Sequence, residues 1–286
     1  MPVRGKNASI GAGVGIVLLA LTWFAAFHVG LVEHADQSIL RGFEGLHRPR
    51  VNALATFIAH LCNPSPYVYL AAVPVVIALV RRRPRVAVAI VLILLSANAT
   101  SQLLKPLLAQ PRPSFAFPPV GPSSAAAWPS GHATAAMSLA LCLVIAVPGR
   151  LRPLVAALGA GFAIAVCYAF LTLGWHFPTD VLGGFLVAAT WTLAGIAGLS
   201  ALEARHPRID PAGSDTLAGQ ASLGETLGPP AAALVAGIAL VGIVALARPH
   251  SVVSYARGHE AFVVGAAAIA VLGLMLAMGL ALALRR

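Results

Sequence analysis

The chain has 286 residues, of which 59% are hydrophobic and only 10% charged, and its mean hydropathy is +0.87. A soluble domain carries about 25% charged residues, so the composition excludes a soluble globular protein. The net charge of +10 does not indicate nucleic-acid partners, because the basic residues lie in short clusters between apolar runs, as membrane topology requires. The composition therefore predicts a protein whose main partners are membrane lipids.

Eight apolar runs approach the roughly 17–25 residues that a membrane-crossing helix needs. Arg4 and Lys6 precede the first run, but it is longer than the apolar region of a signal peptide, and an uncleaved span is expected. The fold class is therefore all-α, a polytopic membrane helical bundle. The runs cover about 11–32, 66–80, 86–104, 133–148, 153–174, 180–202, 230–247 and 261–284.

Polar segments suggest how the spans are grouped. Residues 203–229 are rich in Gly, Pro, Asp and Ser and predict a cytoplasmic linker. The linker separates a six-span core, residues 1–202, from two additional spans in residues 230–286. Residues 33–65 have mixed charge and are expected to include an amphipathic helix at the membrane interface.

The distribution of Lys and Arg predicts the orientation. A cytoplasmic N-terminus places most basic residues, including the RRRPR run at 81–85, on the cytoplasmic side. Both termini of this multi-pass cell-membrane protein are then cytoplasmic. The loop at 105–132 and the turn at 175–180 both face outside.

The proline-rich outer loop carries two cations and a helix start. Lys105 follows the third span, and Arg112 lies between two prolines, which present its guanidinium rigidly for bidentate contact with phosphate. Ser130 is a good N-cap for the fourth span, and Gly131 allows a ligand to approach the backbone. His132 lies in the first turn of that helix, where free N–H groups form an anion site.

The second polar cluster is GWHFPTD, at the start of the sixth span. Pro178 suits the first helical position, and Asp180 falls in the first turn. His176 and Asp180 can therefore meet, so that the carboxylate fixes the imidazole tautomer and leaves one ring nitrogen free.

Topology predicts that these clusters converge. The fourth and sixth spans run in the same direction, so His132 and His176 open on the side that holds Lys105 and Arg112. Two histidines, a carboxylate, two cations and two helix N-termini suit an anion whose charge must be stabilised during reaction, such as a phosphoryl group.

In this arrangement the chain resembles the type 2 phosphatidic acid phosphatase superfamily, with motifs K-x6-R-P, P-S-G-H and S-R-x5-H-x3-D. The first runs from Lys105 to Arg112 and Pro113, the second is intact at 129–132, and the third keeps His176 and Asp180. The third motif departs from the pattern, because Ala169 and Phe170 replace its Ser-Arg pair. The loss of a charge-assisted contact costs about 1.5–3 kcal/mol, or roughly tenfold to a hundredfold in rate.

The resemblance implies an integral membrane lipid phosphatase acting at the outer leaflet on polyprenyl pyrophosphate, phosphatidic acid or phosphatidylglycerol phosphate. It implies that His176 is the nucleophile, forming a phosphohistidine, that Asp180 orients it, and that His132 protonates the leaving oxygen. The phosphate oxygens would be bound by Lys105, Arg112, Ser130 and Gly131. No metal or cofactor is implied, and the opposed histidines predict a bell-shaped pH profile.

Three alternatives remain open. The first is a metal-dependent hydrolase with His132, His176 and Asp180 as ligands, which the two nearby cations disfavour. The second is a non-catalytic lipid-phosphate binding or transport protein, suggested by Phe170. The third is a lipid phosphotransferase that uses the same phosphohistidine. The sequence does not indicate an oligomeric state.

Overall fold

The computed structural model describes residues 2–110, 127–206 and 249–284, with the single positions 224 and 228. Within these residues the secondary structure is helical, with no strand, which confirms the all-α prediction. The helices are α1 (Pro2–His28), α2 (Gly30–Glu44), α3 (Pro49–His60), α4 (Pro64–Val80), α5 (Pro84–Leu107), α6 (Gly131–Ala146), α7 (Arg152–Thr172), α8 (Pro178–Arg205), α10 (Pro249–Gly258) and α11 (Glu260–Ala283), with a 3-10 turn at Gly149–Leu151.

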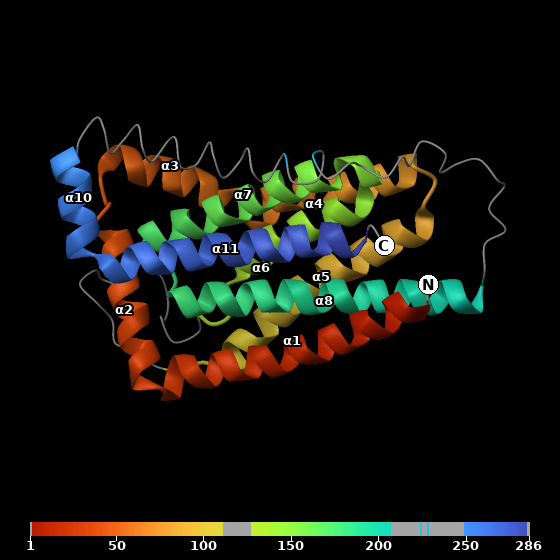
Figure 1. The fold of residues 1–286 in the computed structure, drawn as a ribbon, viewed down its shortest axis with the longest axis horizontal. Helices are drawn as coiled ribbons and strands as arrows, with labels where there is room; N and C mark the ends of the chain where they lie inside the picture. Colours follow the sequence, from red (N-terminus) through yellow and green to blue (C-terminus); the bar gives the residue numbers. More distant parts are fainter. Residues whose placement is uncertain (1, 111–126, 207–223, 225–227, 229–248, 285–286) are drawn as a thin grey trace.

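Most of the long helices run side by side as a bundle (Figure 1). Five of the described helices, α1, α5, α7, α8 and α11, are long and apolar enough to cross a membrane. The protein is thus a multi-pass membrane protein. The predicted spans at 86–104, 153–174, 180–202 and 261–284 correspond to α5, α7, α8 and α11. The predicted span at 230–247 lies outside the described residues.

The segment at 33–65 contains two helices. In Figure 1, α2 runs across one end of the bundle. Its buried residues include Leu40 and Phe43. α3 meets α4 at an angle of 56°, so that the two form a bent pair. The bend falls at Asn63, whose backbone is extended (φ −68°, ψ 153°), because a residue before proline is disfavoured in the helical conformation.

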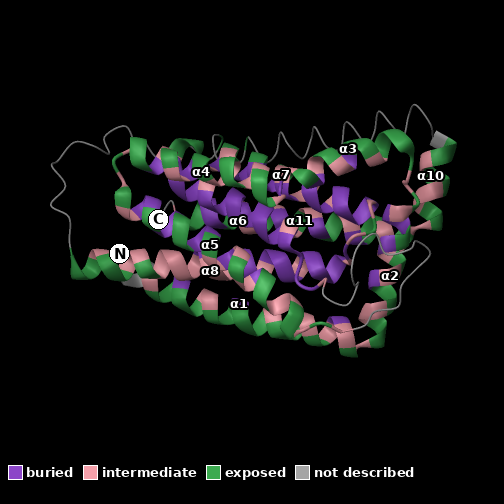
Figure 2. Cartoon of the chain, turned by 180° about the vertical axis from the view of Figure 1, so that it is seen from behind, coloured by how far each residue is buried: buried purple, intermediate pink, exposed green. Residues whose placement is uncertain are grey.

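The most deeply buried helix is α6, which packs against α4, α5, α7, α8 and α11. Figure 2 shows burial concentrated in the middle of the bundle and exposed residues along α1 and α4. Small residues allow close helix packing, as membrane bundles require. On α7, Gly159 faces Ala140 of α6, and a Cβ there would lie 2.9 Å from the alanine Cβ. Apolar side chains such as Leu95 point outward, as expected of a surface solvated by lipid.

The last helix belongs to the same packing arrangement. α11 contacts α7 and α2, and the Tyr168 hydroxyl of α7 donates a hydrogen bond to the carbonyl oxygen of Ala266 over 2.6 Å. At its C-terminal end, Arg152 donates to the carbonyl oxygen of Leu284 over 2.7 Å. The division into a core at 1–202, a linker at 203–229 and a unit at 230–286 stays a prediction, because much of the linker and the span at 230–247 lie outside the described residues.

Candidate active site

Four helix ends meet at the end of the bundle that α2 crosses. Lys105 lies in the last turn of α5, and His132 in the first turn of α6. His176 follows α7 and precedes α8, whose first turn contains Asp180. The structure therefore brings together the residues that the sequence predicted from three separate segments. Arg112, the second predicted cation, lies outside the described residues.

His176 and Asp180 form a buried pair. The Nδ1 atom of His176 lies 3.3 Å from Oδ2 of Asp180, and the aspartate is fully buried. The same carboxylate oxygen accepts the backbone N–H of Phe177 over 2.9 Å. Because an ionised carboxylate is an acceptor only, Nδ1 of the neutral imidazole carries the hydrogen. The lone pair is thereby placed on Nε2 of His176, as a nucleophile or base requires.

The starts of α6 and α8 are tied together. Ser130 caps α6 through a hydrogen bond from the Ala133 N–H to its hydroxyl oxygen, 3.3 Å, and its own N–H donates to the backbone carbonyl of Asp180 over 3.0 Å. The close approach depends on Gly184 of α8, where a Cβ would lie 2.7 Å from the Ser130 carbonyl oxygen. The two helix N-termini consequently open at one place.

His132 is held by a residue that the sequence did not reveal. Its Nε2 lies 3.0 Å from Oδ1 of Asn63, at the bend between α3 and α4. As an amide oxygen accepts, Nε2 is the donor in this contact. The His132 and His176 rings lie 6.5 Å apart between centroids, and Trp175 lies 5.9 Å from His132. The two imidazole rings thus lie next to each other at the start of α6.

Gly131 keeps space open beside Lys105. A Cβ at Gly131 would lie 3.5 Å from Nζ of Lys105 and 2.8 Å from Nε2 of Gln102. The ammonium group, an amide donor and the N-terminus of α6 therefore converge. Gln102 was missed from the sequence, although its position three residues before Lys105 places it on the same helix face.

Phe170 occupies the position at which the family pattern has arginine. Its side chain is fully buried in the last turn of α7. The ring lies 5.1 Å from the His176 ring in an edge-on arrangement and 6.1 Å from that of His132. An apolar ring therefore touches both histidines where a cation was expected.

A third residue that sequence reasoning missed supports the start of α8. Asp36 of α2 is buried and accepts the backbone N–H of Thr179 over 3.0 Å and also the Thr179 hydroxyl. Negative charge at a helix N-terminus is stabilising. Asp36 therefore fixes the helix start that carries Asp180.

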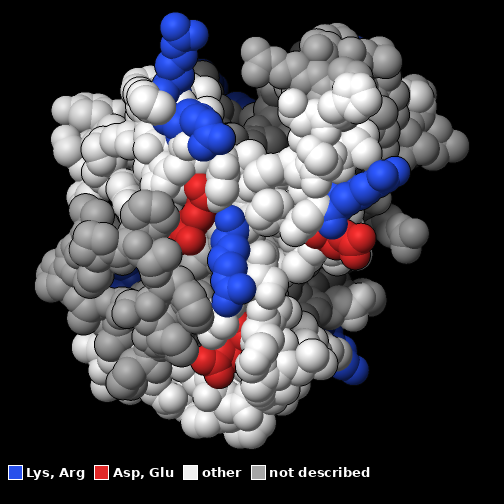
Figure 3. Space-filling view, turned by 90° about the vertical axis from the view of Figure 1, so that its left-hand side faces the viewer, with Lys and Arg blue, Asp and Glu red and all other residues white. Residues whose placement is uncertain are grey.

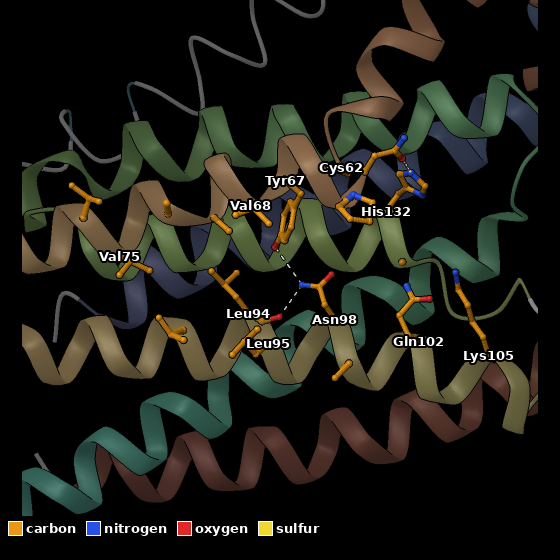
Figure 4. Close-up of a pocket in the computed structure, with 18 residues that line it drawn as sticks. Cys62, Tyr67, Val68, Val75, Leu94, Leu95, Asn98, Gln102, Lys105 and His132 are labelled. Carbon is orange, nitrogen blue, oxygen red and sulfur yellow. Dashed lines mark hydrogen bonds between the residues drawn. The ribbon is translucent and has the colours of Figure 1, made fainter.

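A cavity of about 840 Å³ leads away from His132 and Lys105 between α4 and α5. Figure 4 shows its walls, which are mainly apolar and include Val68, Val75 and Leu95. Several of these residues are also exposed on the outside of the bundle, among them Val68 and Leu95. The site is thus continuous with a long apolar groove on the lipid-facing side.

The surroundings of the site are of mixed charge. Figure 3 views the end of the bundle where α2 and α10 lie, and both basic and acidic side chains appear on it. Glu44, at the end of α2, would touch a Cβ at Gly174, next to Trp175. Burial raises the pKa of Glu44, and the charge of Arg41 opposes the rise. In the described part of the chain, no group of three His, Cys, Asp or Glu side chains is placed to hold a metal.

Comparisons with known proteins point to one family of membrane phosphatases. The family model of the PAP2 superfamily matches residues 86–202. The chain is 29% identical over 181 residues to phosphatidylglycerophosphatase B of Bacillus subtilis (strain 168), covering 60% of this chain and 87% of that protein. It also resembles the crystal structure of a transmembrane PAP2 type phosphatidylglycerolphosphate phosphatase from Bacillus subtilis, with a TM-score of 0.57 and 24% identity over 70% of this chain and 98% of that one.

Proposed function

Since the chain belongs to the PAP2 superfamily, we propose that it is a membrane phosphatase that hydrolyses a lipid phosphate, with phosphatidylglycerol phosphate as the first candidate substrate. The observation that carries the proposal is the His176–Asp180 pair, which lies next to His132, while Lys105 lies close to the neighbouring Gly131. The apolar groove that begins at His132 and Lys105 suits the hydrocarbon part of a lipid.

In the first step His176 acts as the nucleophile. The Nε2 lone pair attacks phosphorus, while Asp180 holds the proton on Nδ1 and stabilises the positive imidazole that forms. The bond between phosphorus and the lipid oxygen breaks, and protonated His132 gives to that oxygen the proton on Nδ1, the ring nitrogen that does not bond Asn63. The products are the lipid alcohol and a phosphohistidine.

In the second step water completes the cycle. Water attacks the phosphorus of the phosphohistidine, gives a proton to His132 and releases inorganic phosphate from Nε2 of His176. Both steps develop charge on the phosphoryl oxygens. The N-terminus of α6 at Ser130 and Gly131, together with Lys105 and Arg112, stabilises that charge without a metal ion.

We place the site at the outer leaflet, with both termini in the cytoplasm. The arginines of the α4–α5 junction and of the start of α7 lie at the end of the bundle opposite the site. Positive residues favour the cytoplasmic side of a membrane protein. Labelling of single cysteines introduced at Arg83 and at His34 with an impermeant thiol reagent tests this; reaction of the Arg83 position in intact cells would contradict the orientation.

The enzyme assay is phosphate release by the purified protein from a panel of lipid phosphates in detergent micelles. We expect His176→Ala to abolish release and Asp180→Asn to reduce it strongly. The matched control is His34→Ala, because His34 is exposed on α2. We also expect EDTA to have no effect and labelled substrate to leave an acid-labile phosphate on the wild-type chain. Equal phosphate release by the wild type and by His176→Ala would refute the proposed phosphatase activity.

Phe170 favours a second candidate, a lipid-phosphate binding or transport protein with little turnover. The ring supplies no charge for the phosphate, although it completes the packing around both histidines. Specific binding of the lipid without phosphate release by the wild type would support this candidate. Transfer of the phosphoryl group to an added alcohol in place of water would instead indicate a phosphotransferase.

A further inference from the structure

The apolar groove contains a fixed polar side chain, Asn98, away from its phosphate end. Asn98, Gln102 and Lys105 all line the cavity from α5, at the i, i+4 and i+7 spacing of one helix face (Figure 4). Lys105 and Gln102 converge at Gly131, which marks the phosphate end. Asn98 lies seven residues before Lys105, or about 10 Å away along the helix axis at 1.5 Å per residue.

The amide of Asn98 is held in one orientation. Its Nδ2 atom donates to the carbonyl oxygen of Leu94 over 2.8 Å and to the Tyr67 hydroxyl over 3.3 Å. The Tyr67 hydroxyl in turn lies 3.2 Å from the carbonyl oxygen of Ala135. A flipped amide would bring two acceptors together at Leu94, so the orientation is set by these contacts.

Both hydrogens of the Asn98 amide are thus used, and its carbonyl oxygen is left for the cavity. Among the described residues no side chain or backbone group forms a hydrogen bond to this oxygen. The neighbouring walls are apolar, with Leu94, Leu95 and Val91 among them. A ligand that fills the groove must either offer a polar group or a bound water at this depth, or cover the oxygen with hydrocarbon.

We propose that Asn98 is a specificity-determining residue that selects glycerol-based lipid phosphates over polyprenyl phosphates; the inference rests on the proposed function. In a glycerol-based lipid, ester oxygens and the waters they bind continue below the phosphate, and such a water satisfies Oδ1 of Asn98. In a polyprenyl diphosphate, hydrocarbon begins directly after the phosphates and leaves that oxygen without a hydrogen-bond partner. A polar group left desolvated discriminates against the wrong ligand.

The test is calorimetric binding of dioctanoyl phosphatidic acid and of farnesyl diphosphate to the full chain in detergent. The His176→Ala background prevents turnover, so that binding reports on the groove. We expect Asn98→Leu to raise the Kd of dioctanoyl phosphatidic acid and to lower that of farnesyl diphosphate. The ratio of the two Kd values should shift about tenfold, the change that 1.4 kcal/mol produces.

Two further variants keep the result interpretable. Leu95→Ala changes an apolar wall residue on the same helix, and we expect it to raise the Kd values of both ligands by the same factor. Tyr67→Phe removes one acceptor of Asn98 while retaining the ring, and we expect a shift of the Kd ratio in the same direction but smaller, about threefold. If Asn98→Leu does not fold, Tyr67→Phe decides.

An unchanged Kd ratio in the deciding variant overturns the proposal that Asn98 determines selectivity. A merely structural role of Asn98 would weaken the binding of both ligands equally. Failure of the parent protein to bind either ligand also overturns it. The proposed phosphatase activity is tested separately. If the wild type releases no phosphate but Asn98→Leu still shifts the Kd ratio, the phosphatase proposal is refuted and the selective binding site stands.

Discussion

The ring of Phe170 stands edge-on to the imidazole of His176, with 5.1 Å between centroids and an interplanar angle of 73°. The arrangement is a favourable aromatic contact. The last turn of α7, which contains Phe170, has no basic residue. The proposed nucleophile is therefore positioned by one carboxylate, Asp180, and one apolar ring.

Replacing Phe170 with arginine restores the family pattern at this position. Phe170 lies next to the rings of both histidines, so an arginine at this position places its guanidinium near the phosphate that His176 would attack. We expect Phe170→Arg to raise kcat/KM for lipid phosphate about tenfold. We also expect it to lower the Tm, because a charge replaces a fully buried ring. Phosphate-release kinetics and thermal unfolding in detergent measure the two effects.

Phe170→Leu is the control for the loss of the ring. It removes the contact with His176 without adding a charge, and we expect both kcat/KM and Tm to fall. An arginine variant that loses activity to the same extent as the leucine variant would show that packing, and not the missing cation, governs this position.

Local signals account for what the sequence predicted well. Ser130 and Pro178 mark helix starts through their own chemistry, and they place His132 and Asp180 in first turns without knowledge of the packing. The common direction of the fourth and sixth spans then follows from counting membrane crossings. For this reason the convergence of the two histidines could be predicted from the sequence.

The supporting residues could not be predicted, because their partners are distant in the chain. Asp36 contacts Thr179, 143 residues away, and Asn63 contacts His132, 69 residues away. Neither pair has a spacing that a helix or turn would impose. The position of Asn98 also depends on how α4 packs against α5, since Tyr67 holds its amide.

Gly184 is predicted to be essential for the joint start of α6 and α8. A Cβ there would lie 2.7 Å from the carbonyl oxygen of Ser130 and 2.8 Å from the Cβ of Ala133, so Gly184→Ala must separate the two helices. We expect a destabilisation of about 1–3 kcal/mol and a loss of most phosphate release. The control is Gly198→Ala on the same helix, where no atom lies within 4 Å of the new Cβ. Equal behaviour of the two variants would contradict the prediction.

Asp36 is predicted to act on catalysis through α8 without touching the substrate. Asp36→Ala removes the acceptor for the N–H and hydroxyl of Thr179, and we expect a loss of about 1–2 kcal/mol in stability. kcat should fall more than KM rises, because the displaced group is Asp180 and the phosphate site at Gly131 remains. Asp36→Asn keeps one acceptor oxygen and should restore part of kcat. A change confined to Tm, with kcat unaltered, would leave Asp36 a purely structural residue.

Glu44 gives the stability of the protein a predictable dependence on pH. Burial raises the pKa of this carboxyl above its usual value of about 4.5, so the folded state favours the protonated form. The stabilisation is present below pH 4.5 and is lost as pH rises through the raised pKa. We expect Glu44→Gln to have the Tm of the wild type at pH 4 and a Tm roughly 1–2 °C higher at pH 7, a small effect because the group is partly exposed and screened. Thermal unfolding at the two pH values measures it. A Tm difference that is the same at both would mean that ionisation of Glu44 does not contribute.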